Sequence, residues 1–162
     1  MDKYTISVLV ENNAGVLSRI AGLFSRRGYN IESLSVGVTE DSKISRMTIC
    51  GFADEQTLEQ IKKQLNKLIE VIKVVQLASE NSVYRELAMI KVKADDASRA
   101  SIAAMANIFR ANIIDVSPES LTLEVTGDEG KIDAFINLMK PYGIIELLRT
   151  GTAAIQRGEN GI

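Results

Sequence analysis

The feature that most constrains the fold is an order of elements that occurs twice along the chain. In each half, the apolar pattern runs strand, helix, strand, strand, helix, strand, with a period of two in the strands and of three or four in the helices. This βαββαβ order is typical of a ferredoxin-like unit, in which helices cover one face of an antiparallel sheet. The sequence therefore predicts an α+β protein with two ferredoxin-like domains in tandem.

The first half has the clearer patterns. Its first helix follows Gly15 and ends at Gly28, which suits a left-handed cap, and Asp54 can cap its second helix. The predicted elements are strands at 5–10, 31–38, 44–52 and 71–77 and helices at 15–27 and about 58–68.

The second half repeats the order with a different sequence. Its predicted elements are strands at 87–93, 113–116, 121–125 and 144–148 and helices at about 97–110 and 131–139. Between the halves, a small and polar stretch without periodicity favours a linker. We therefore expect a first domain over 1–78, a linker over 79–83 and a second domain over 84–162, with a frayed tail from 156. Domains this small bury modest cores, so a homodimer is expected.

Composition excludes several kinds of function. A formal charge of −2 over 162 residues leaves no basic excess to neutralise a nucleic-acid backbone. No apolar run approaches the roughly 20 residues that cross a bilayer, and the N-terminus shows no leader pattern. The single cysteine, Cys50, cannot form an internal disulfide, which is typical of a reducing compartment. We expect a cytoplasmic protein that binds neither nucleic acid nor membrane.

Residues for catalysis are scarce. The absence of histidine removes the commonest general base and the commonest metal ligand. Cys50 lies in a predicted strand and is interpreted as a buried apolar residue, and no carboxylates show calcium-loop spacing. The segment Gly127–Ile132 has glycines too close together for a phosphate-binding loop and lacks the hydroxyl residue that should follow Lys131. No catalytic residue and no metal site are predicted.

The loop before the first helix is the strongest candidate for a binding site. Gly15 lets a ligand approach the free N–H groups of the first helical turn, which favour a carboxylate. Asn12 adds an amide that both donates and accepts, as a zwitterion requires. At the other end of the helix, Asn30 adds a second amide near carbonyls suited to an ammonium group. The simpler interpretation is that the asparagines only cap the helix or its turn.

The same residues carry a resemblance to a known family. The run Asn12-x-x-Gly15-Val16-Leu17 resembles the ACT domain of the small, regulatory subunit of acetolactate synthase, also called acetohydroxyacid synthase. The likeness continues through 23–34, 45–49 and 59–68, and through 108–111, 114–116 and 149–151 of that family's C-terminal domain.

This resemblance implies a regulatory role without catalysis. A family member binds the large catalytic subunit, activates it and makes it sensitive to feedback by valine or a related branched-chain amino acid in branched-chain amino-acid biosynthesis. Thiamine diphosphate, magnesium and FAD then belong to the catalytic subunit, so no cofactor is expected in this chain.

The resemblance also implies where the effector binds. ACT domains pair into a homodimer, with the effector between the first loop of one copy and the end of the first helix of the other. The family pattern places the effector contacts at Asn12, Gly15, Val16 and Leu17 on one side and at Asn30 and Ile31 on the other. An apolar pocket would select only partially among valine, leucine and isoleucine, because one methylene is worth about 1–3 kcal/mol.

Three other functions stay open on the sequence alone. A tandem sensor that acts on gene expression is disfavoured by the acidic balance, and a metal-responsive regulator lacks histidine ligands. A small-molecule enzyme would need a base such as Asp115 or Glu124, with its pKa raised by burial, and nothing in the sequence selects one.

Overall fold

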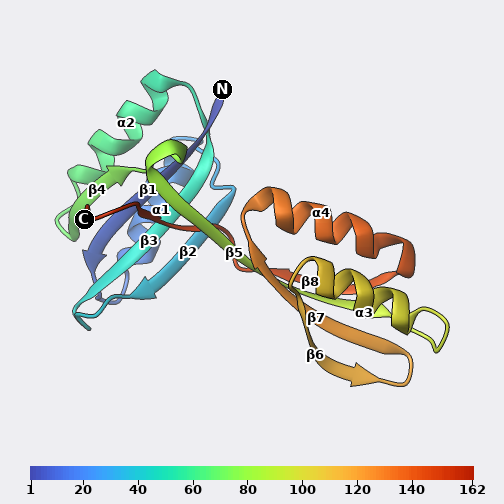
Figure 1. The fold of residues 1–162 in the computed structure, drawn as a ribbon. Helices are drawn as coiled ribbons and strands as arrows, with labels where there is room; N and C mark the ends of the chain where they lie inside the picture. The colour runs from blue at the N-terminus through green and yellow to red at the C-terminus, as the bar shows by residue number, and fades with distance from the viewer. The chain divides into compact units, whose positions relative to one another are not determined.

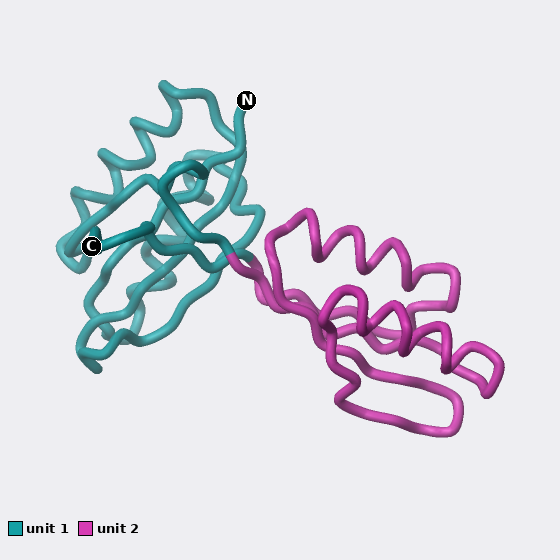
Figure 2. The backbone as a smooth tube through the Cα atoms, in the orientation of Figure 1, with its two compact units in different colours: residues 1–84, 152–162 teal, residues 85–151 magenta.

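The computed structural model describes residues 1–162 as two compact units, each built around its own antiparallel sheet (Figures 1 and 2). The first unit comprises Met1–Tyr84 and Thr152–Ile162, and the second comprises Arg85–Gly151. Both units have the βαββαβ order with helices on one face of the sheet. The predicted fold class is confirmed.

The first unit forms a four-stranded sheet in the order β2-β3-β1-β4. Its elements are β1 (Asp2–Glu11), α1 (Val16–Arg26), β2 (Ser33–Val38), β3 (Ile44–Ala53), α2 (Glu55–Asn66) and β4 (Val71–Gln76). Alternate residues of β1, among them Ile6 and Val8, are fully buried beneath Ile20 and Phe24 of α1. The period-two pattern of β1 and the helical period of α1 thus meet in one core.

The second unit has the sheet order β6-β7-β5-β8. Its elements are β5 (Ser82–Lys93), α3 (Arg99–Ile108), β6 (Asn112–Ser117), β7 (Ser120–Gly127), α4 (Glu129–Met139), the short 3-10 helix η2 (Lys140–Tyr142) and β8 (Ile144–Arg149). Ile90 of β5 and Leu123 of β7 are fully buried and are opposite each other in the sheet. Ile102 and Phe135 cover them from the helices.

The chain returns to the first unit after Gly151. A short strand, β9 (Ala153–Gln156), pairs with β5, and the Arg157 amide donates to the Asn81 carbonyl at 2.8 Å. The expectation of fraying is therefore wrong for Gln156 and Arg157, whereas residues 158–162 form no helix or strand. The four-residue strand β9 is too short to show a period, and its partner lies far away in the sequence.

The unit boundaries also differ from those expected from the sequence. The stretch expected as a linker holds the 3-10 helix η1 (Ser79–Asn81) and the start of β5, and the boundary lies between Tyr84 and Arg85. β5 is one continuous strand whose first residues belong to the first unit and whose remainder belongs to the second.

The sheet of the first unit has a second face, opposite its helices, that is small and polar. Thr5, Ser7 and Thr48 lie on this face and are buried, as is Cys50, whose thiol lies 3.4 Å from the Thr5 hydroxyl. The chain after Gly151 lies over this face, where the Thr152 amide donates to the Ser33 hydroxyl at 3.3 Å. The interpretation of Cys50 as a buried residue is confirmed.

Candidate functional site

The loop between β1 and α1 leaves backbone donors free at the start of the helix. Gly15 is the N-cap residue, and its φ of 87° is left-handed, which glycine adopts without steric cost. No side chain caps the helix. The Val16 and Arg19 amides donate to the carbonyls of Asn13 and Gly15, but the amides of Leu17 and Ser18 have no acceptor in the protein. These two N–H groups point out of the helix end, as an anion requires.

Asn12 does not cap the helix. Its side-chain amide donates to the Ser42 carbonyl at 2.9 Å, and its backbone amide donates to the Lys43 carbonyl at 2.8 Å. These bonds tie the loop to the turn between β2 and β3 and leave the side-chain oxygen of Asn12 free to accept. Asn13 is also engaged elsewhere, because its amide donates to the Glu11 carboxylate at 3.0 Å. The simpler interpretation, in which these asparagines cap α1, is wrong.

The far end of α1 presents the second predicted set of residues. The chain leaves the helix through Gly28, with a φ of 70°, and the Tyr29 amide donates to the Phe24 carbonyl at 2.9 Å. This arrangement leaves Asn30 exposed, while Ile31 is half-buried against the core.

The two predicted sets lie at opposite ends of α1. At 1.5 Å per residue, the 11 residues of the helix separate them by about 16 Å. Asn12, Gly15, Val16 and Leu17 thus come together in one chain, and Asn30 and Ile31 form a separate group. Val16 is buried and offers only its backbone, whereas Leu17 is 44% exposed at the loop. No single small ligand can contact both groups within one chain.

The Asn30 carbonyl packs close to Gly51 and Tyr4, a contact that the sequence did not predict. Tyr4 and Gly51 are opposite each other in β1 and β3, and the Tyr4 ring fills the space above the glycine. A Cβ atom on Gly51 would lie 2.6 Å from the Tyr4 hydroxyl and 2.9 Å from the Asn30 carbonyl oxygen. Burial raises the pKa of Tyr4 to about 12, and its hydroxyl has no hydrogen-bond partner. A large aromatic residue opposite glycine was the signal that could have revealed this contact.

Gly51→Ala is therefore expected to lower the free energy of unfolding by about 1–3 kcal/mol, through overpacking. Urea denaturation measures this loss, and the amide shift of Asn30 in an NMR spectrum reports the displaced loop. Tyr4→Phe is the control: it removes a buried hydroxyl that has no partner, so stability should stay equal or rise. An unchanged Asn30 signal in a fully stable Gly51→Ala variant would contradict this account.

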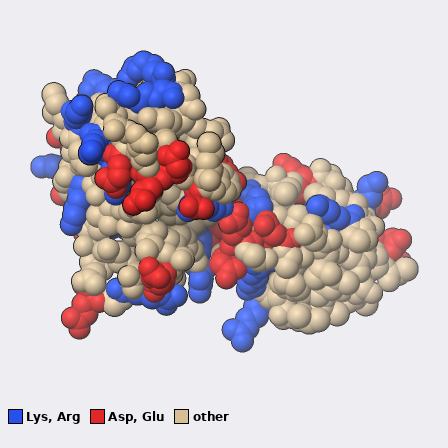
Figure 3. All heavy atoms as spheres, turned by 90° about the horizontal axis from the view of Figure 1, so that it is seen from above, with Lys and Arg blue, Asp and Glu red and all other residues tan.

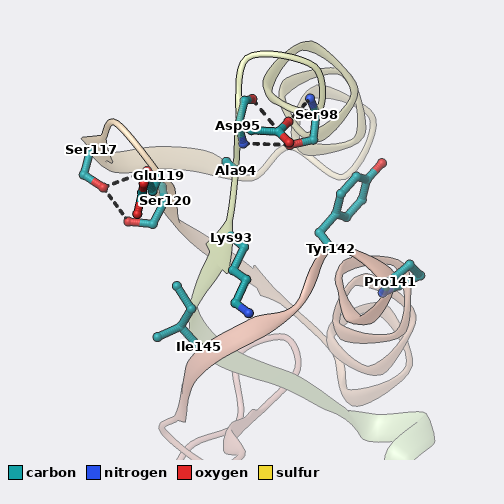
Figure 4. A pocket seen from close by; sticks show the side chains of 10 residues that line it. All are labelled: Lys93, Ala94, Asp95, Ser98, Ser117, Glu119, Ser120, Pro141, Tyr142 and Ile145. Atoms are coloured by element: carbon teal, nitrogen blue, oxygen red, sulfur yellow. Dashed lines mark hydrogen bonds between the residues drawn. The ribbon is translucent and has the colours of Figure 1, made fainter.

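At the corresponding end of the second unit, the polar groups are hydrogen-bonded to one another. A cavity of about 860 Å³ lies there, beside the start of α3 (Figure 4). The Asp95 carboxylate accepts a hydrogen bond from the Ser98 amide at 2.8 Å. The hydroxyls of Ser117 and Ser120 are hydrogen-bonded to each other at 2.6 Å. Since Asp95 already fills the role of an anion at this helix end, a carboxylate ligand has fewer free donors here than at Gly15.

The structure gives little support to the two alternative functions that need their own chemistry, an enzyme and a metal-responsive regulator. Asp115 is exposed and Glu124 only half-buried, so neither has the deep burial that the enzyme hypothesis needs. No three acidic or cysteine side chains gather as metal ligands. The helices are each too short or too polar to cross a bilayer. On the face shown in Figure 3, basic side chains form small groups separated by acidic and uncharged ones.

Comparison with known proteins decides the family. Residues 6–73 match the model of the AHAS small subunit-like ACT domain, and residues 85–158 match the model of the small subunit of acetolactate synthase. The chain belongs to the acetolactate synthase small-subunit family. The resemblance inferred from the sequence is confirmed.

Individual relatives of the small-subunit family agree over the full length. The acetolactate synthase small subunit of Mycobacterium bovis is 57% identical over 159 residues, covering 98% of this chain and 95% of the relative. That of Mycolicibacterium smegmatis is 53% identical, covering 98% and 94%. The crystal structure of the acetolactate synthase small subunit from Thermotoga maritima superimposes with a TM-score of 0.92 at 42% identity, covering 99% of this chain and all of the other.

Proposed function

We propose that this chain binds the large catalytic subunit of acetolactate synthase, raises its activity and confers feedback inhibition by valine or a related branched-chain amino acid. Membership of the small-subunit family supports the partner. The observation that supports the sensor is the glycine-capped start of α1 with two free N–H groups. Thiamine diphosphate, magnesium and FAD belong to the catalytic subunit in this proposal, and the complex works in the cytoplasm.

The carboxylate of the effector lies at the start of α1. The amides of Leu17 and Ser18 donate to it, and the positive end of the helix dipole adds to the attraction. The free side-chain oxygen of Asn12 accepts from the ammonium group, because the amide side of Asn12 is already bonded to Ser42. Leu17, exposed at this loop, supplies apolar contact for the effector side chain.

A second copy of the chain supplies the rest of the site. Asn30 and Ile31 lie too far from Gly15 to contact the same amino acid in one chain, so they act on the effector bound at the partner's loop. The edge strand β2 suits such pairing, because Val36 and Val38 are 45% and 60% exposed and its outer edge has no partner strand. The effector is therefore enclosed only in the homodimer formed by the ACT domains.

Mixed dimers test this arrangement. Asn12→Ala and Asn30→Ala chains, each with a different tag, are co-expressed and purified through both tags, and valine binding is measured by isothermal titration. If the site spans two copies, the mixed dimer holds one intact site and one doubly altered site, whereas each homodimer holds none. Valine binding by the mixed dimer alone is the expected result.

The other outcomes are informative as well. A mixed dimer that binds no valine, beside a wild type that does, would place both asparagines in a site within one chain. Undiminished valine binding by both homodimers would place both asparagines outside the site. Absence of binding by the wild type would contradict a complete sensor in this chain alone. Co-purification with the large subunit and a rise in its acetolactate synthase activity test the activating role independently.

A further inference from the structure

A cavity of about 210 Å³ lies in the first unit, on the sheet face opposite the helices. Ser35 and Gly37 of β2 and Arg46 and Thr48 of β3 form its floor, and residues 153–155 of β9 form a wall. It is separate from the effector residues, which lie at the ends of α1. The run Ser45–Ile49, which carried part of the family resemblance, contributes its Arg46 and Thr48 to this cavity and nothing to the effector site.

A row of hydroxyl groups crosses the floor of the cavity and continues beneath it. Ser35 pairs with Thr48, and Thr48 pairs with Ser7, in adjacent positions of β2, β3 and β1. Thr48 is 4% exposed and Ser7 is fully buried. The Ser7 hydroxyl is buried and has no hydrogen-bond partner, and the Thr48 side chain above it lines the cavity. Buried hydroxyls are normally bonded, so Ser7 indicates a missing donor or acceptor on this face of the sheet.

Arg46 adds a positive charge that no carboxylate neutralises. Its side chain is half-buried beside Thr48, it forms no ion pair, and none of the cavity residues is acidic. Gly37 lies directly opposite Arg46 in the sheet, and a Cβ atom at Gly37 would meet nothing within 4 Å. The missing side chain thus leaves open space next to the guanidinium group, whose planar fork matches carboxylate and phosphate oxygens.

We propose that this cavity binds a small oxyanion, the carboxylate or phosphate group of a small metabolite. The Arg46 guanidinium neutralises its charge, and the hydroxyls of Thr48 and Ser35 donate to its oxygens. Because β9 forms a wall of the cavity, the bound anion also holds the C-terminal strand against the sheet. The ligand is thus coupled to the order of residues 153–156.

NMR titration of the full chain tests the proposal, with sodium phosphate and sodium acetate as separate probes at constant ionic strength and without valine. We expect saturable shifts of the Gly37, Arg46 and Ala154 amides with at least one probe, and slower hydrogen exchange in β9. Arg46→Gln should weaken binding at least tenfold and Thr48→Val several-fold. Lys67→Gln, which removes an exposed charge at the C-cap of α2, is the matched control and should change neither the binding nor the hydrogen exchange of β9.

The outcomes separate the two sources of the oxyanion. Saturation by phosphate alone points to a phosphorylated ligand, and saturation by acetate alone points to a carboxylic acid. Saturation by both assigns the site to the oxyanion itself. No saturable shift with either probe, or the same affinity in Arg46→Gln as in the wild type, would overturn the proposal. Since valine is absent, this failure is distinct from a failure of the effector site.

Discussion

Replacing Arg149 by alanine is expected to lower the free energy of unfolding of the second unit by about 3–5 kcal/mol, because it leaves a buried carboxylate without its partner. Glu86 is 5% exposed, and Arg149 donates to both of its oxygens, at 2.6 and 2.9 Å. A third bond, of 2.8 Å, joins Arg149 to Asp133. The hydrogen bonds to Glu86, with a smaller contribution from Asp133, raise the pKa of Arg149 above its usual value.

The measurement must resolve the second unit, since the two units need not unfold together. Native-state hydrogen exchange at the buried amides of Ile90 and Leu123 gives the opening free energy of that sheet. Asp133→Ala is the control: it removes an exposed partner, whose loss should cost less than about 1 kcal/mol. Replacing both Arg149 and Glu86 by methionine should restore most of the stability, because no unpaired charge remains. Equal costs for Arg149→Ala and Asp133→Ala would refute this explanation.

Gly15→Asp should weaken valine binding by about 100-fold or more, equivalent to roughly 3 kcal/mol. The substitution places a negative charge where the proposed effector carboxylate meets the N–H groups of α1. Two negative charges next to each other repel. A Cβ atom at Gly15 meets nothing within 4 Å, so no steric clash accompanies the change. Isothermal titration with valine measures the loss.

Gly15→Asn separates charge from backbone strain. The φ of 87° disfavours both new side chains, but asparagine and aspartate are the residues that best tolerate left-handed backbone. Gly15→Asn should therefore keep its valine affinity within about tenfold of the wild type, since no charge is added. If Asn and Asp weaken binding equally, strain explains the loss and the carboxylate lies elsewhere.

Local patterns predicted most of the fold, because each strand and helix of the two cores has its own period. Ile6 and Val8 face Ile20 and Phe24 as the two periods require. What escaped prediction depends on partners distant in sequence. β9 is recognisable only by its pairing with β5, and the Tyr4–Gly51 contact only by the register of β1 against β3.

Part of the candidate site could also be predicted from local sequence, and part of it could not. The left-handed Gly15 and the free donors after it follow from a glycine at a helix start, and the structure has both. The bonds of Asn12 to the distant turn at Ser42 and Lys43 could not be read from local preference, which favoured capping. The contact of an amino acid with Asn12 and Asn30 together stays a prediction, since it needs a second copy.

The return of the chain to the first unit makes the second unit, Arg85–Gly151, an insertion between the first residues of β5 and β9. On the ribosome, residues 1–84 emerge first and can form the four-stranded sheet with its two helices, and the inserted unit follows with all of its own strands. The sheet face that carries Ser35 and Thr48 remains without β9 until Ala153–Gln156 leave the exit tunnel. A nascent chain halted before Thr152 would therefore carry a first domain without β9 and a second unit that already has all of its residues, so the arrival of β9 is the step that completes the first domain.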